Sequence, residues 1–222
     1  MSGEFFSRNR LFYGDEAIER FRNSSVAVCG VGGLGCVVCE VLARTGVGRL
    51  IVVDRGVVDE PDLGRQTLYS FDDLGKPKVE AAKRRLKTIS MSHVEAVMLD
   101  VTGDRDVALS DADLVVDCLD NFPARFRLEE HLKMGQWLVH GAVENDYGQV
   151  TTLRKGSGTT LREFYSGIES TQAHIPVTTS AVFAVATLMA QEALNVILGK
   201  PELYGKLLVV ELSGFRCSTL PI

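Results

Sequence analysis

The fold is decided by residues 26–54, which begin Val26-Ala-Val-Cys-Gly-Val-Gly-Gly-Leu-Gly35 and end Arg49-Leu-Ile-Val-Val-Asp54. An apolar run typical of a buried strand leads into the pattern G-x-G-x-x-G. A helix-forming segment then extends to Ala43, and a second apolar run ends on an acidic residue. Strand, glycine loop, helix, strand and acid in this order are typical of half of a nucleotide-binding α/β fold. A tight turn that serves only packing would explain fewer of these features.

The glycines and the acidic residue each have a predicted role. We expect Gly30 to let the chain turn out of the strand, Gly32 to let the backbone approach a phosphate, and Gly35 to let the helix pack on the sheet. The start of the helix then offers N–H groups to an anion. Asp54 is suited to accept hydrogen bonds from a ribose diol. The pattern does not say which nucleotide binds.

Composition narrows the class of protein. The 222 residues include 24 Lys and Arg against 29 Asp and Glu, a net charge of −5, and 45% of them are hydrophobic. These values are typical of a globular protein, here predicted as one α/β domain over residues 1–222, and the lack of a basic cluster argues against a nucleic-acid partner. Residues 1–10 lack the apolar core of a signal peptide, and the apolar stretch Ser180 to Ala190 is too short to span a bilayer. We therefore expect a cytoplasmic protein without membrane contact.

Five cysteines lie at positions 29, 36, 39, 118 and 217, an odd number that suits a reducing compartment. Cys36 and Cys39 form a C-x-x-C pair one helical turn apart, without a second pair to complete a tetrahedral metal site. We interpret them as packing residues rather than redox or zinc-binding residues. Zinc is not expected.

The rest of the chain alternates helices and strands. A helical arm in residues 1–22 precedes the first strand, and residues 154–177 are predicted as a long irregular crossover loop. A helix capped by Thr178-Thr179-Ser180 and closed by Gly199 is apolar on nearly every face between Ala181 and Ala190, so we expect it in the core or at a subunit contact. The other predicted elements are helices at 79–88 and about 123–134, and strands at 93–99, 113–121, 137–143, 148–153 and 207–212.

Two cations follow Asp54 in loops rich in glycine and proline. Such loops lie at the carboxyl edge of an α/β sheet, where ligands bind, so Arg65 and Lys78 would both point into one crevice. Backbone N–H groups alone can hold the pyrophosphate of a dinucleotide, whereas a triphosphate carries more charge and calls for added cations. The two side chains therefore favour a nucleoside triphosphate.

Acidic residues end the predicted strand at 113–121. Asp117 and Asp120 stand at its carboxyl end, and Asn121 can cap the helix that starts near Pro123. Mg²⁺ prefers oxygen ligands and binds through one or two carboxylates together with phosphates. Asp120 is the candidate magnesium ligand, and the alternative is that it only caps the helix.

Taken together, these motifs resemble the MoeB/ThiF/HesA family, the bacterial relatives of ubiquitin-activating enzymes that adenylate sulfur-carrier proteins. The resemblance runs from about Phe5 to Phe215. It implies a doubly wound, Rossmann-like mixed sheet with helices on both faces, extended by antiparallel strands near the C-terminus, and a homodimer. The residues that carry it are Arg8-Asn-Arg10, Gly30 to Gly35, Asp54, Asp62-Leu-Gly-Arg65-Gln66, Lys78-Val-Glu80 and Asp117-Cys-Leu-Asp120-Asn121.

By this resemblance Arg65, Gln66 and Lys78 would hold the phosphates of ATP, Asp120 the Mg²⁺, and Asp54 the ribose. Arg10 would reach the triphosphate from the partner subunit, and Arg125 would contact the tail of the carrier. The implied catalytic set is Arg10, Arg65, Lys78 and Asp120. The implied nucleotide-binding set is Gly30, Gly32, Gly33, Gly35, Asp54, Asp62, Gln66 and Asn121.

The chain departs from the family pattern at three points. Where the family commonly has Asn, three residues before the phosphate-binding arginine, this chain has Asp62, which adds a negative charge near ATP unless a cation offsets it. The two C-x-x-C zinc pairs of many members are missing. No cysteine lies in residues 154–177, where members that carry an acyl group or sulfur covalently place theirs.

The implied reaction is ATP-dependent adenylation of the C-terminal carboxylate of a small ubiquitin-like carrier ending Gly-Gly, with pyrophosphate released. A separate sulfur or amine donor would receive the acyl group, since the chain shows no placed nucleophile. Three alternatives stay open: activation of another carboxylate on a peptide or modified tRNA nucleoside, a nicotinamide-dependent oxidoreductase, and a non-catalytic nucleotide-binding module. The oxidoreductase would leave Arg65, Lys78 and Asp120 without a shared purpose.

Overall fold

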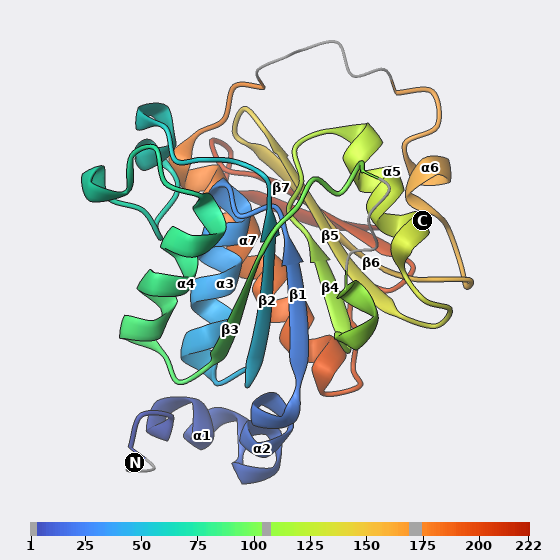
Figure 1. The fold of residues 1–222 in the computed structure, drawn as a ribbon. Coiled ribbons are helices and arrows are strands. Elements are labelled where there is room, and N and C mark those ends of the chain that lie inside the picture. Colours follow the sequence, from blue (N-terminus) through green and yellow to red (C-terminus); the bar gives the residue numbers. More distant parts are fainter. Residues whose placement is uncertain (1–3, 104–107, 169–174) are drawn as a thin grey trace.

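A computed structural model of the chain describes residues 4–103, 108–168 and 175–222. Its centre is an eight-stranded sheet with the order β3-β2-β1-β4-β5-β6-β7-β8 (Figure 1). The strands from β3 to β5 are parallel, and β6, β7 and β8 are antiparallel. Their bounds are β1 Ser25–Cys29, β2 Arg49–Asp54, β3 His93–Met98, β4 Leu114–Asp117, β5 Trp137–Glu144, β6 Tyr147–Arg154, β7 Lys206–Glu211 and β8 Arg216–Pro221.

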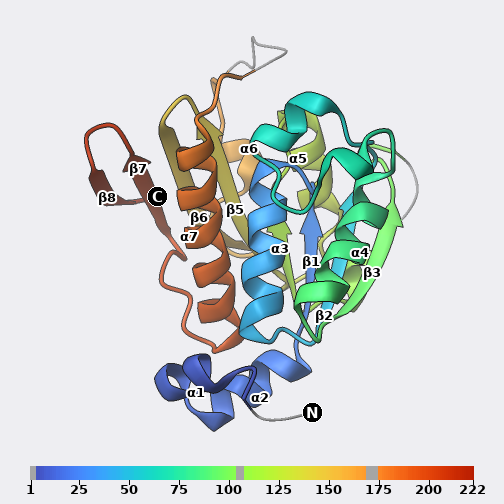
Figure 2. The same ribbon diagram turned by 90° about the vertical axis from the view of Figure 1, so that its left-hand side faces the viewer.

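Helices cover both faces of this sheet. The helices α3, α4 and α7 lie on one face, with α5 and α6 on the other (Figure 2). The predicted fold class, a doubly wound mixed sheet extended by antiparallel strands, is therefore confirmed. The helical bounds are α1 Ser7–Tyr13, α2 Asp15–Asn23, α3 Gly33–Thr45, α4 Lys78–Ile89, α5 Phe122–His131, α6 Leu161–Phe164 and α7 Thr179–Ile197, with short 3-10 turns at Glu60–Gly64, Phe71–Asp73 and Ala108–Asp111.

The apolar run of β1 is explained by burial on both faces. Val26 and Val28 belong to the core cluster under α3 and α7, whereas Ala27 and Cys29 belong to the cluster under α5. Successive side chains of a strand point to opposite faces, so a central parallel strand must be apolar at every position. β1 therefore sits at the centre of the molecule, and the glycine loop follows directly from it.

The helix α7 packs against α3 and the strands β4, β5 and β6. The Thr178 hydroxyl caps it by accepting a hydrogen bond from the Ala181 N–H at 3.2 Å, as predicted. Among the described residues, α7 is the one helix with the length and apolar composition to cross a membrane, because it extends beyond the apolar stretch at 180–190. Its apolar window is 56% buried inside the protein, as in the core helix of a globular protein.

Three elements differ from the sequence prediction. The strand predicted at 113–121 is β4, which ends at Asp117, so Asp120 lies in the loop that follows it. The strand β8 was not predicted, because all its residues are exposed at the sheet edge and no apolar alternation marks it. The segment 154–177 is not irregular throughout: Thr160 and Glu163 form a capping box that starts α6, and Leu161 and Tyr165 are buried. The part of that segment at 169–174 lies outside the described residues, as do residues 1–3 of the predicted arm.

Candidate nucleotide-binding site

The strand order reverses at β1, which has β2 and β3 on one side and β4 and β5 on the other. Ligands of open α/β sheets bind at the carboxyl ends of the strands at such a switch point. A cavity of about 840 Å³ lies there, formed by the ends of β1, β2 and β4 and by the loops that follow them. All predicted site residues except Arg10 and Gly35 line it: Gly30, Gly32, Gly33, Asp54, Asp62, Arg65, Gln66, Lys78, Asp120, Asn121 and Arg125.

The glycine loop is shaped by close backbone contacts. Gly30 has φ +88°, and a Cβ there would lie 2.6 Å from the carbonyl oxygen of Cys118. A Cβ on Gly35 would lie 1.9 Å from the carbonyl oxygen of Gly30, so only glycine lets α3 start this close to the loop. Gly35 thus supports the site from behind the cavity. Gly32 is different, because its Cβ would approach Gln66 Nε2 only to 3.8 Å, which leaves room beside the loop for a ligand.

Asp54 holds this loop in place. Its Oδ2 accepts a hydrogen bond from the Val31 N–H, and its Oδ1 accepts one from the Gly56 N–H, each at 2.7 Å. A carboxylate offers about four acceptor positions, so two remain for the hydroxyl groups of a ribose. The sequence analysis predicted that Asp54 binds a ribose, but it did not predict these two hydrogen bonds to the glycine loop.

The cationic side of the cavity is built around Asp62. Lys78 Nζ lies 2.9 Å from Asp62 Oδ2, and Arg65 Nη2 lies 3.6 Å from Asp62 Oδ1. Gln66 Nε2 donates to Asp62 Oδ1 at 2.6 Å, while Gln66 Oε1 is buried without a hydrogen-bond partner among the described residues. Two cations therefore offset the negative charge that Asp62 adds. A buried amide beside the glycine loop with an unpaired oxygen fits a site that binds a polar ligand.

Asp120 and Asp117 differ in their exposure to the cavity. Asp120 is exposed at the cavity, and its Oδ1 accepts a hydrogen bond from Asn121 Nδ2 at 3.0 Å. Asn121 caps α5 by accepting from the Ala124 N–H at 2.9 Å, so the helix has a cap other than Asp120. Asp117 is completely buried and bonded to His140, so it is not available to a ligand in the cavity.

The donor set can be tested for a magnesium ion. Within the described residues, no group of three or more His, Cys, Asp or Glu side chains could hold a metal on its own. A single exposed carboxylate beside phosphates is nevertheless sufficient for Mg²⁺, which keeps several waters and binds through one or two carboxylates plus substrate phosphates. Asp120 fits that requirement.

Arg125 lines the cavity although it is only 6% exposed. Its Nε and Nη2 donate to the Leu119 carbonyl oxygen at 3.2 and 2.7 Å, and its Nη1 donates to the Tyr165 hydroxyl at 3.1 Å. None of these partners is a carboxylate. A buried guanidinium held by neutral acceptors keeps its positive charge available to an anion in the cavity.

A buried polar network behind Arg125 could not be predicted from the sequence. His140 Nε2 lies 2.6 Å from the Tyr165 hydroxyl, which also accepts from Gln149 Nε2 at 2.6 Å. Burial lowers the pKa of His140, so the ring is neutral, donates through Nδ1 to Asp117 and accepts the Tyr165 proton at Nε2. The hydroxyl then uses its one proton and both lone pairs. The available signal was a histidine within an apolar strand, which needs buried partners.

The buried cysteines agree with the packing interpretation. Cys36 and Cys39 are both completely buried in the core next to α7. Burial raises the pKa of Cys36 to about 12 and that of Cys39 well above its usual value, so both remain thiols at neutral pH. Cys217 in β8 is exposed.

Arg10 lies away from this cavity. It belongs to α1, which lies with α2 beyond the amino ends of the strands, at the end of the sheet opposite the crevice (Figure 1). Its Nε lies 2.8 Å from Asp15 Oδ1. The side chain is therefore remote from the site of its own subunit.

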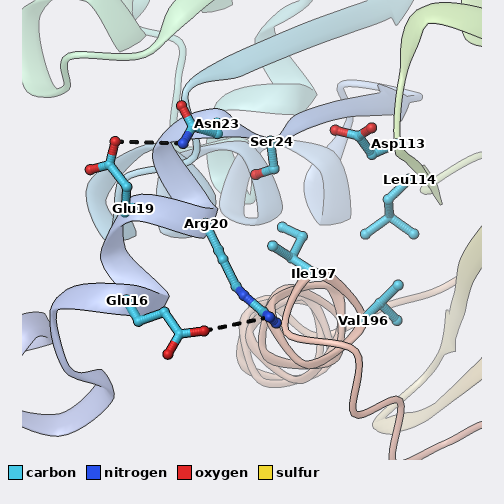
Figure 3. A pocket seen from close by; sticks show the side chains of 9 residues that line it. All are labelled: Glu16, Glu19, Arg20, Asn23, Ser24, Asp113, Leu114, Val196 and Ile197. Carbon is cyan, nitrogen blue, oxygen red and sulfur yellow. Dashed lines mark hydrogen bonds and ion pairs between the residues drawn. The ribbon is translucent and has the colours of Figure 1, made fainter.

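A second groove, of about 480 Å³, lies near α2 and the C-terminal end of α7 (Figure 3). Its described lining combines the carboxylates of Glu16, Glu19 and Asp113 with apolar side chains of β4 and α7. The guanidinium of Arg20 there already bonds to the Leu198 carbonyl oxygen and to Glu16. The described lining of this groove has one cation against three carboxylates and does not include the glycine loop, so it is unsuited to phosphates.

The fold and the cavity together define a nucleotide-binding, Rossmann-like α/β protein. Residues 6–222 match the ThiF family, and the chain belongs to that family. The resemblance seen in the sequence motifs is thereby confirmed.

Curated relatives cover nearly the whole chain. The sulfur carrier protein adenylyltransferase of Thermus thermophilus is 37% identical over 89% of this chain and 78% of its own length. The SAMP-activating enzyme E1 of Haloferax volcanii is 34% identical over 94% of this chain and 80% of its own length. Among solved structures, E. coli MccB with ATP superposes with a TM-score of 0.79 at 22% identity, covering 100% of this chain and 71% of that chain. This last similarity concerns the fold alone.

Proposed function

We propose that this chain is an ATP-dependent adenylyltransferase that activates the C-terminal carboxylate of a small ubiquitin-like sulfur-carrier protein. The observation that carries the proposal is the combination of cations and carboxylates in one cavity beside the glycine loop. The relatives named as sulfur carrier protein adenylyltransferases, in Thermus thermophilus and Bacillus subtilis, support the same reaction class. An oxidoreductase of this fold would have no use for this charge arrangement.

The nucleotide would lie along the carboxyl ends of the strands. Asp54 would bind the ribose, and the glycine loop with the start of α3 would hold the phosphates through backbone N–H groups. Lys78, Arg65 and Gln66 would stand on the far side of the phosphates. Asp120 would contribute one oxygen ligand to Mg²⁺, which neutralises phosphate charge when it is bound.

The reaction joins two anions. An oxygen of the carrier carboxylate attacks the α-phosphorus, the bond from that phosphorus to the bridging oxygen of the β-phosphate breaks, and pyrophosphate leaves. An ionised carboxylate needs no general base, so the side chains act by positioning and by stabilising negative charge. Arg125 is suited to the carrier tail, because its buried charge has no carboxylate partner among the described residues.

We further propose a cytoplasmic homodimer acting on a carrier that ends Gly-Gly, with a separate sulfur donor receiving the acyl group. In this assembly Arg10 would enter the cavity of the partner subunit, since it lies far from its own. The N-terminal arm is then part of the active site of the dimer.

The test is ATP–pyrophosphate exchange with purified candidate carriers. We expect exchange only with a carrier that has an intact C-terminal Gly-Gly, and none with the same carrier lacking these two residues. Exchange supported by free peptides and not by any carrier would favour the other class of carboxylate. Tight binding of NAD with no binding of ATP would overturn the proposal altogether.

A further inference from the structure

The carboxylate of Asp62 lies among the side chains expected to bind phosphate. It is 8% exposed. Its oxygens form ion pairs with Lys78 at 2.9 Å and Arg65 at 3.6 Å, and they accept a hydrogen bond from Gln66 Nε2 at 2.6 Å. Arg65 also folds back on its own turn, where Nη1 donates to the Pro61 carbonyl oxygen at 2.8 Å. The cations of the site are therefore already engaged by groups of the protein.

A capping role explains only part of this arrangement. Asp62 Oδ2 accepts from the Asp59 N–H at 3.1 Å, as the second half of a capping box on the 3-10 turn Glu60–Gly64. That bond uses one acceptor position of the carboxylate and needs no cation. The side chain of Lys78 is 15% exposed and that of Asp62 is 12% exposed. Water and salt therefore weaken this ion pair less than they weaken a pair on the surface. The negative charge of Asp62 therefore acts on any anion that binds to Lys78.

We propose that Asp62 is an internal counter-ion of the phosphate-binding cations. In the nucleotide-free protein it pairs with Lys78 and Arg65 and cancels one of their two positive charges, so a ligand's phosphate oxygens meet a rival acceptor at these cations. Phosphate groups then compete with Asp62, whereas the base and the ribose bind without competition. Asp62 thus lowers the part of the binding affinity that comes from the phosphate groups. It also favours release of the pyrophosphate product, because Lys78 then pairs with Asp62 again.

This inference rests on the nucleotide site proposed above and predicts the effect of removing one charge. Asp62→Asn keeps the shape of the side chain and an oxygen for the Asp59 N–H, but it no longer competes for the cations. We expect ATP and pyrophosphate to bind roughly tenfold more tightly to D62N than to the unaltered protein, the scale expected for one like charge near the phosphates. Adenosine, which has no phosphate, should bind with unchanged affinity.

Isothermal calorimetry of the full chain with ATP, pyrophosphate and adenosine at one Mg²⁺ concentration measures these affinities. Asp59→Asn is the matched control, because it alters the other half of the capping box and leaves the Asp62–Lys78 pair in place. Its ratio of ATP to adenosine affinity should not change. Thermal unfolding checks that each variant folds. If D62N does not fold, Asp62→Ser takes its place in the experiment.

The outcomes separate this inference from the proposed function. Unaltered protein that binds ATP, together with a D62N variant whose ratio of ATP to adenosine affinity is unchanged or lower, would overturn the counter-ion role alone. An equal gain for ATP and adenosine would also overturn it, since that would reflect a looser cavity. Absence of ATP binding to both proteins would overturn the counter-ion role and the nucleotide site together.

Discussion

Nδ1 of His140 lies 2.7 Å from Oδ2 of Asp117, and both side chains are completely buried. The pair joins β5 to β4, and through Tyr165 it reaches the segment that follows α6. Since burial lowers the pKa of His140, the folded protein holds the neutral ring. The network therefore connects the stability of the region behind the cavity to pH.

The first prediction concerns that pH dependence. The unfolded chain binds a proton at His140 near pH 6.5, and the folded chain binds it only at lower pH. The contribution of His140 to stability is therefore complete above about pH 6.5 and is lost as the pH falls toward the folded pKa, by up to about 1.4 kcal/mol per pH unit. Urea unfolding at several values between about pH 7.5 and 5 measures this slope.

The matched variant is His140→Gln, which removes the titrating group. It should be less stable than the unaltered protein at pH 7.5, because Asp117 and Tyr165 lose their partner, and its free energy of unfolding should depend less on pH over this interval. Equal slopes for the two proteins would show that His140 is not the group responsible.

A second prediction concerns the magnesium ligand. Asp120→Ala should abolish ATP–pyrophosphate exchange and leave the fold intact, because the side chain is exposed and Asn121 supplies the cap of α5. Exchange assays over a range of Mg²⁺ concentrations, with circular dichroism of each protein, measure both effects. Asp72→Ala is a control of the same kind, since Asp72 is also an exposed aspartate and does not line the cavity. Near-normal exchange by D120A with unchanged metal dependence would leave Asp120 without the assigned role.

A third prediction concerns the glycine loop. Gly35→Ala should lower the free energy of unfolding by roughly 2–4 kcal/mol, because the new Cβ would lie 1.9 Å from the Gly30 carbonyl oxygen and force α3 away from the loop. Gly64→Ala is the comparison, since a Cβ there meets nothing within 4 Å, and its stability should change by less than about 0.5 kcal/mol. Chemical denaturation of the two variants decides the matter. Similar stability losses would contradict the close-packing explanation.

The sequence predicted what local chemistry determines. The run Val26 to Cys29 is apolar throughout because both faces of β1 are buried. The carboxyl end of β2 and the loop after β4 bring Asp54 and Asp120 to the switch point. Pairs that depend on tertiary contact could not be derived. Asp62 and Lys78, and likewise His140 and Tyr165, meet only because separate elements pack together.

The exposed strand β8 was missed for a related reason. It pairs with β7 through backbone hydrogen bonds, while all its side chains are exposed, so no burial pattern marks it in the sequence. Hydrophobic periodicity detects strands that bury one or both faces. An edge strand without a buried face gives no such signal.

The last prediction is that Arg10 acts across a twofold dimer. In the described part of the chain α1 lies at the end of the sheet opposite the cavity, and Arg10 is paired with Asp15 there. Any role of this side chain in nucleotide binding would therefore require a second subunit. Arg10→Ala and Asp120→Ala proteins should each be nearly inactive, since each would lack one group that every active site requires.

Subunit exchange between these two variants tests the shared site. In a mixed dimer, one site would combine an intact Asp120 with the intact Arg10 of the other subunit, and the second site would carry both lesions. Random pairing of equal amounts makes about half of the dimers mixed, so roughly a quarter of all sites should regain exchange activity if the interface is an isologous twofold one. If Arg10 served its own subunit, every site in the mixed dimer would keep one lesion. Mixing would then restore nothing, and that result, with subunit exchange verified by mass labelling, would exclude the shared site.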